Sequence, residues 1–171
     1  MNRHFLPDLL LCLIVSVLFI PACDKFKNDP QYVGTWQFTE QITADDIVYS
    51  TTRTLTLARS SWEETYVIKH LGSPGISAII GTRGKLGMSH TSLVFYLDEL
   101  GTCVPDEMDK CTDQVEWYGE GTVYWNLNNQ YFEKAVPAKY EVKDNLLTLM
   151  RDLNNDGDYN DTGENVTFQM I

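Results

Sequence analysis

The stretch from residue 33 to residue 171 alternates repeatedly between apolar and polar residues, and this pattern constrains the fold more than any other feature. Side chains of a β-strand point alternately to the two faces of a sheet, so a period of two is typical of half-buried strands. The pattern predicts strands near residues 33–40, 47–58, 61–70, 76–86, 91–99, 114–127, 131–143, 145–152 and 164–171. No segment has the spacing of an amphipathic helix of normal length. The sequence therefore predicts an all-β protein.

Turn-forming residues separate these predicted strands, at 72–75, 128–129, 144–145 and 156–157. Eight or nine consecutive antiparallel strands with one apolar face must close or stack, because long edges would otherwise stay exposed. A single antiparallel up-and-down β-barrel of 8–9 strands is the simplest solution at this length. A two-layer β-sandwich is the alternative.

The longest alternating segment, 114–127, predicts which side chains point inward. Trp117 and Trp125 share its apolar face with Gly119 and Gly121, which leave a gap in the lining. Glycines there indicate either a bend in the strand or room for a ligand. The candidate wall of a binding cavity is Tyr66, Phe95, Trp117 and Trp125. The same aromatic side chains can also simply fill the core of a barrel.

The N-terminus contains a short apolar run, Leu9 to Ile20, that ends in Ile20-Pro-Ala-Cys23. A run this short, closed by small residues, is typical of a cleaved export signal. The four residues resemble the lipobox of bacterial lipoproteins. The resemblance implies cleavage before Cys23, a lipid on that cysteine and anchoring to a membrane of the bacterial cell envelope. The alternative is an ordinary secretory signal followed by an unmodified cysteine. The predicted organisation is a signal peptide at 1–22, a tether at 23–31 and a barrel at 32–171.

The two ends of the predicted barrel carry a second resemblance. Val33-Gly-Thr-Trp36 resembles the first-strand Gly-x-Trp signature of lipocalins, and 140–149 with 165–168 resembles the last strands of lipocalin-like lipoproteins from bacteria. The resemblance implies an eight-stranded barrel that holds one small apolar ligand. It also implies that Trp36 packs at the closed end, with Arg151 as the candidate for the late-strand arginine that commonly covers this tryptophan.

The net charge narrows the classes of partner. The formal charge is −11 at pH 7, and so acidic a chain repels nucleic acid. We expect no nucleic-acid partner. Divalent cations are plausible partners, because a negatively charged chain attracts them.

Cys103 and Cys111 lie in one polar segment, 101–113. In an exported chain this arrangement predicts a disulfide that closes a loop. Half of a metal site is the alternative, although the chain offers few further thiol or imidazole ligands. The loop also presents Val104, Pro105, Glu107 and Met108, which are candidates for docking a partner protein of the envelope.

The segment from Asp152 to Glu164 spaces its oxygen ligands as a calcium loop does. Asp152, Asn154, Asp156 and Asp158 fall on alternate residues, and Gly157 permits a tight turn. The segment resembles the calcium loop of EF-hands, except that Glu164 comes one residue after the usual place of the last ligand. The predicted metal ligands are these four residues and Glu164, with calcium as the cofactor. The alternative is a plain acidic hairpin loop.

Enzymatic chemistry has little support. His70 and His90 lack a nucleophile motif beside them, and adjacent acidic residues on a strand point to opposite faces. The sequence therefore predicts a non-catalytic, membrane-anchored binding module for a small apolar or amphipathic ligand. The alternative is an interaction module with a filled barrel that docks an envelope protein through the loop 101–113.

Overall fold

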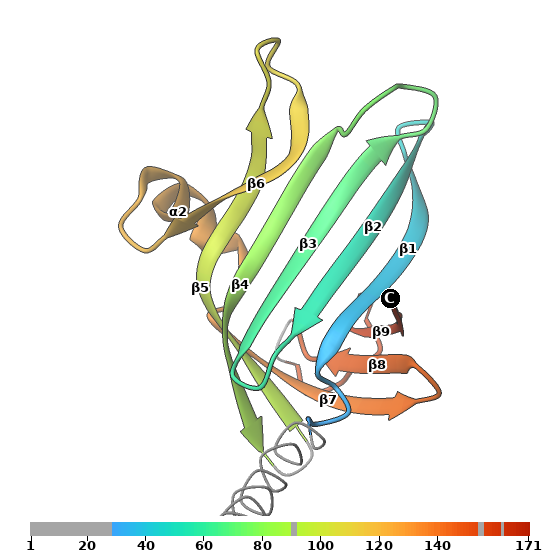
Figure 1. Cartoon of the computed structure of the whole chain (residues 1–171), viewed down its shortest axis with the longest axis vertical. Coiled ribbons are helices and arrows are strands. Elements are labelled where there is room, and N and C mark those ends of the chain that lie inside the picture. The colour runs from blue at the N-terminus through green and yellow to red at the C-terminus, as the bar shows by residue number, and fades with distance from the viewer. Residues whose placement is uncertain (1–28, 90–91, 154–155, 162) are drawn as a thin grey trace, which may run out of the picture. The chain divides into compact units, whose positions relative to one another are not determined.

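The computed structural model describes residues 29–89, 92–153, 156–161 and 163–171. Within this part of the chain it contains nine strands and two short helical segments (Figure 1). The strands are β1 (Gly34–Ala44), β2 (Ile47–Leu57), β3 (Ser61–His70), β4 (Ala78–Ser89), β5 (Ser92–Pro105), β6 (Cys111–Gly119), β7 (Ala135–Lys143), β8 (Leu146–Arg151) and β9 (Asn165–Met170). Helix α2 (Val123–Asn128) and the 3₁₀ segment η3 (Asn129–Tyr131) lie between β6 and β7. The signal peptide and Cys23 lie outside the described residues.

All pairings between these strands are antiparallel, in the order β4-β3-β2-β1-β9-β8-β7-β5-β6. A further pairing of β4 with β5 closes eight of them into a barrel, and β6 adds to β5 as an extra strand. The predicted single antiparallel barrel is therefore confirmed. Closure removes the sheet edges that so many consecutive strands would otherwise expose.

Strand β5 changes its partner along its length, and this opens one side of the barrel. Its first part, Ser92–Tyr96, pairs with β7, whereas Glu99–Pro105 pairs with β6. The ladder between β4 and β5 has a bulge beside Gly84, where an added Cβ would overlap the carbonyl oxygen of Tyr96. Only glycine fits this close approach, and a bulge bends the strand locally. In Figure 1 the hairpin of β5 and β6 accordingly projects away from β7.

The core fills one end of the barrel. Trp36, Leu55, Leu93, Leu147 and Phe168 are fully buried. The rest of the buried apolar cluster is Tyr32, Leu57, Trp62, Leu86, Phe95, Ala138, Leu149 and Val166. These residues come from alternate positions of strands across the whole barrel, as the inward face of each strand requires.

The prediction of one strand across 114–127 is wrong. The strand β6 ends at Gly119, and Gly121 has a positive φ of 91°, which a strand does not accommodate. Thr122 then caps α2, because its hydroxyl oxygen accepts a hydrogen bond from the backbone N–H of Trp125. The predicted turn at 128–129 falls where α2 ends and η3 begins. No helix in the described ranges is both long and apolar enough to cross a bilayer.

Candidate functional site

The barrel contains a cavity of about 490 Å³, which borders the core at Trp62 and Phe95. Strands β3, β4, β5, β7 and β8 form its walls, and the segment after α2 covers its side where β5 leaves β7. Its lining residues are Trp62, Glu64, Tyr66, Ile80, Thr82, Phe95, Leu97, Gln130, Tyr131, Phe132, Glu133, Val136, Arg151 and Leu153. Small-molecule sites are typically concave spaces of about 300–1,000 Å³ with mostly apolar walls and a few polar groups. The cavity fits this description.

Three buried charged side chains form a cluster at the cavity wall, which we call the Arg53–Glu64–Arg151 cluster. The Glu64 Oε1 atom accepts hydrogen bonds from Arg53 Nη2 at 2.9 Å and from Arg53 Nε at 3.3 Å. Arg151 donates from Nη1 to Glu64 Oε2 at 2.7 Å and from Nη2 to Oε1 at 3.3 Å. The exposed fractions of the side chains are 5%, 2% and 7% in chain order. One carboxylate therefore holds two arginines out of water.

The protonation states of the cluster follow from its contacts. Burial alone would raise the pKa of Glu64, but Arg151 and Arg53 outweigh that effect and hold the pKa below its usual value. Burial would lower the pKa of Arg151, and Glu64 reverses this and raises it. Burial, together with the Glu64 carboxylate, raises the pKa of Tyr66. At neutral pH the cluster therefore carries two positive charges and one negative charge beside a neutral phenol.

Aromatic rings hold the arginines in place. The Arg53 guanidinium carbon lies 4.7 Å from the centre of the Tyr66 ring and 5.3 Å from that of Phe168. The Arg151 guanidinium carbon lies 5.9 Å from the centre of the Phe95 ring. A cation within about 6 Å of a ring face is attracted by the ring quadrupole, more strongly where water is excluded.

Two of the four residues expected to form the cavity wall lie on it, and two lie elsewhere. Tyr66 and Phe95 line the cavity. Trp125, in α2, is buried but is not among the lining residues. Trp117 lies on the outer face of the barrel.

The glycines of β4 and β5 explain the position of Trp117. An added Cβ on Gly81 would lie 2.7 Å from its ring, and one on Gly101 would lie 2.9 Å from it. Ile80 and Thr82 flank Gly81 in the strand and line the cavity, so the position of Gly81 points outward. Trp117 therefore packs where two glycines leave room on the outside.

The sequence carried a signal for the buried charges. Arg53 alternates with Leu55 and Leu57, and Glu64 alternates with Trp62, so each charge lies on a strand face that is otherwise apolar. Charged residues are almost never fully buried unless they are paired, which makes such positions informative. The resemblance also implied that Arg151 covers Trp36, which stays a prediction; the Arg151 guanidinium donates hydrogen bonds to Glu64.

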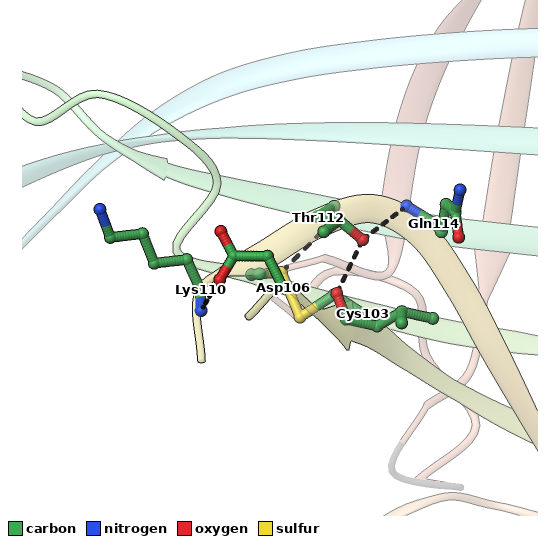
Figure 2. The surroundings of a disulfide bond; sticks show 7 residues. Cys103, Asp106, Lys110, Thr112 and Gln114 are labelled. Carbon is green, nitrogen blue, oxygen red and sulfur yellow. Dashed lines mark hydrogen bonds between the residues drawn. A yellow bond between two sulfur atoms is a disulfide. The ribbon is translucent and has the colours of Figure 1, made fainter. Parts of the chain in front are cut away.

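The predicted disulfide between Cys103 and Cys111 is confirmed, and it closes the hairpin of β5 and β6 (Figure 2). Asp106 Oδ1 accepts hydrogen bonds from the backbone N–H groups of Met108 and Lys110, each at 2.8 Å. The Lys110 and Met108 hydrogen bonds lower the pKa of the Asp106 carboxyl. These hydrogen bonds between the Asp106 side chain and the backbone of the loop order its turn. Met108, at the tip of the loop, is 70% exposed.

The acidic loop after β8 folds around its own carboxylates. Asp152 accepts hydrogen bonds from the N–H groups of Asp156 and Gly157, both at 3.1 Å. Asp158 likewise accepts from Asn160 N at 2.9 Å. Asn154, a predicted ligand, lies outside the described residues.

Glu164 ties this loop to the barrel. It is 1% exposed, and its carboxylate accepts hydrogen bonds from Leu153 N at 2.8 Å and Asp161 N at 3.2 Å. Glu164 also raises the pKa of Asp161. Within the described part of the chain, no three His, Cys, Asp or Glu side chains are grouped closely enough to hold a metal. Calcium binding therefore stays a prediction.

We expect calcium at about 10 mM to raise the melting temperature by several degrees, because extracellular calcium modules bind with dissociation constants of about 0.1–1 mM. Differential scanning calorimetry with and without the ion measures this shift. Asp158→Asn should abolish it, whereas Asp113→Asn, which changes the net charge equally in β6, should leave it intact. An unchanged melting temperature in wild type would count against the site.

Comparison of the chain with protein-family models and with curated proteins found no match.

Proposed function

We propose that this protein is a non-catalytic binding module that holds a small apolar or amphipathic ligand inside its barrel. The cavity of about 490 Å³ is the observation that carries the proposal, because side chains can fill a barrel of this size completely. Here they leave a space between β3, β4, β5, β7 and β8. The space is partly open to solvent, and a concave space of this volume is typical of a small-molecule site.

The chemistry of the lining supports an amphipathic ligand. Phe95, Leu97 and Val136 provide an apolar surface, and Glu64 and Arg151 provide charge at one place on the wall. Apolar side chains also lie exposed where the cavity opens, among them Ile80 at 40% and Tyr131 at 74% exposure. Apolar side chains at an entrance suit a ligand whose body leaves water as it binds.

Displacement of an uncharged apolar fluorophore, N-phenyl-1-naphthylamine, tests the proposal. Wild-type protein should bind the fluorophore with increased emission, and native mass spectrometry of the purified protein should detect a co-purified lipid. Val136→Trp fills the cavity and should weaken binding of the fluorophore at least about tenfold, since the ligand and the new ring compete for one space.

Val48→Trp is the matched control, because Val48 lies in β2, is 37% exposed and does not line the cavity. It should bind the fluorophore as wild type does. If wild type bound neither fluorophore nor lipid, or if both variants weakened binding equally, the cavity would not be a binding site.

The rival prediction was a filled barrel that docks a partner through the disulfide loop. Its premise is a solid interior, and the cavity argues against that premise.

We further propose that a lipid on Cys23 tethers the barrel to a membrane of the bacterial cell envelope, on the strength of the lipobox resemblance. Mass spectrometry of the N-terminal peptide of the mature chain should show acyl groups on Cys23, and an unmodified cysteine would contradict the tether.

A further inference from the structure

Charge balance at the cavity wall identifies one property of the ligand. The Arg53–Glu64–Arg151 cluster holds two guanidinium groups and one carboxylate, which leaves one positive charge in excess. Within the described residues Glu64 is the carboxylate that pairs with both arginines. A buried charge without compensation is costly, because water no longer solvates it. The excess charge therefore needs a partner.

Hydrogen bonding points to the same place. The Nε atom of Arg151 is buried and has no hydrogen-bond partner, although both Nη atoms bind Glu64. The large majority of buried side-chain polar atoms in proteins are hydrogen-bonded, so this donor calls for an explanation. Arg151 lines the cavity, 6% exposed, so a group bound there lies beside the arginine that carries this donor.

The other titratable groups around the cavity do not supply the missing charge. Tyr66 is a neutral phenol at pH 7. Glu133 also lines the cavity but is exposed, so water screens it from the buried arginines. Glu164 is also buried, but its carboxylate faces the backbone N–H groups of Leu153 and Asp161, whereas the ion pairs of Arg53 and Arg151 are with Glu64.

We propose that the ligand carries a single carboxylate, which pairs with the Arg53–Glu64–Arg151 cluster through Arg151, and an apolar body that fills the rest of the cavity. This inference rests on the proposed ligand-binding function. One negative charge neutralises the cluster, and an arginine hydrogen-bonds a carboxylate more strongly than it does a neutral oxygen. Phe95, Leu97 and Val136 contact the apolar body.

Competition among twelve-carbon compounds tests the head group alone. Dodecanoate, dodecanol, methyl dodecanoate and dodecyl phosphate share one chain, and each is titrated against the fluorophore bound to the wild-type protein at pH 7. Dodecanoate should compete at least about tenfold better than the alcohol or the ester, the effect expected of one charged hydrogen bond. Dodecyl phosphate carries nearly two charges, so it over-compensates the cluster and should compete less well than dodecanoate.

Arg151→Met removes the excess charge and leaves Arg53 paired with Glu64. It should abolish the preference for dodecanoate over dodecanol while the fluorophore still binds. Arg83→Met is the matched control, because Arg83 lies on the outer face against Trp117 and is not part of the cavity wall. It should retain the preference.

The outcomes separate the two proposals. Equal competition by dodecanoate and dodecanol in wild type would overturn the carboxylate assignment and leave ligand binding intact. Stronger competition by dodecyl phosphate would assign the site to a phosphate head group instead. Failure of every compound, together with failure of the fluorophore to bind, would overturn ligand binding itself. The wild-type series decides the matter even if Arg151→Met does not fold.

Discussion

Replacing Glu64 with glutamine will destabilise the barrel by about 3–5 kcal/mol, the loss expected when one partner of a buried ion pair is removed. The substitution keeps the shape of the side chain but leaves Arg53 and Arg151 buried with two positive charges and no carboxylate. Urea denaturation at pH 7, followed by tryptophan fluorescence, measures the change in unfolding free energy.

The neighbouring glutamate provides a matched control. Glu63 lies on the opposite face of β3, with a side chain that is 45% exposed and 3.6 Å from Arg83. Exposed ion pairs contribute about 0–1 kcal/mol, so Glu63→Gln should be nearly neutral. Comparable losses in the two variants would contradict the buried cluster.

The pH dependence gives an independent readout. The folded-state pKa of Glu64 is lowered, so its contribution is fully present above the unfolded-state value, near 4.5, and is lost as pH falls through the folded-state value. Wild type should therefore lose stability in acid more steeply than Glu64→Gln, which has no group to protonate at that position. Parallel acid profiles would show that Glu64 is not ionised in the folded state.

A cluster of this kind is a poor way to stabilise a core. Well-packed apolar residues in place of a buried ion pair are often as stable or more so, because desolvation offsets most of the attraction. Glu64, Arg53 and Arg151 occupy positions where the barrel pattern calls for apolar side chains. Their presence next to a cavity, with one donor left without a partner, fits a binding role better than a structural one.

Most of the fold could be predicted because its strands are encoded locally. Alternation marks each strand, and turn residues such as Asp144 and Asn145, both with positive φ, mark the hairpins. The stretch after Gly119 could not be predicted in this way, because its residues alternate as a strand does. The positive φ of Gly121 and the Thr122 cap, which depend on backbone geometry, turn it into a helix instead.

The site depends on contacts between residues that are distant in the sequence, and the alternation of apolar and polar residues along a strand does not reveal such contacts. Glu64 and Arg151 are 87 residues apart in the sequence, and only closure of the barrel brings them together. The aromatic residues illustrate the same limit. Trp117 has the pattern of an inward residue, but it lies on the extra strand β6, which pairs with β5 beyond Glu99. Its ring packs on the glycines of the outer face, Gly81 and Gly101. Which rings line the cavity follows from closure and not from the pattern along one strand.

Trp36 lies in the buried core of the barrel, and Trp36→Ala will destabilise the protein by about 3–5 kcal/mol. The side chain is fully buried, and its Nε1–H donates a hydrogen bond to the Tyr32 carbonyl at 2.8 Å. Removal of the indole leaves a cavity that rigid strands on both sides, β2 and β9, can only partly close.

Two further variants identify the cause of this loss. Trp36→Phe keeps a ring but leaves the Tyr32 carbonyl without its donor. It should therefore lower the unfolding free energy relative to wild type, but by less than Trp36→Ala does. Trp117→Ala removes a ring of equal size from the outer face, where it is half-buried, and should cost about 1–2 kcal/mol. Urea denaturation of all three variants gives the order. If the loss at Trp117 equalled or exceeded the loss at Trp36, Trp36 would not be the buried core residue that the structure shows.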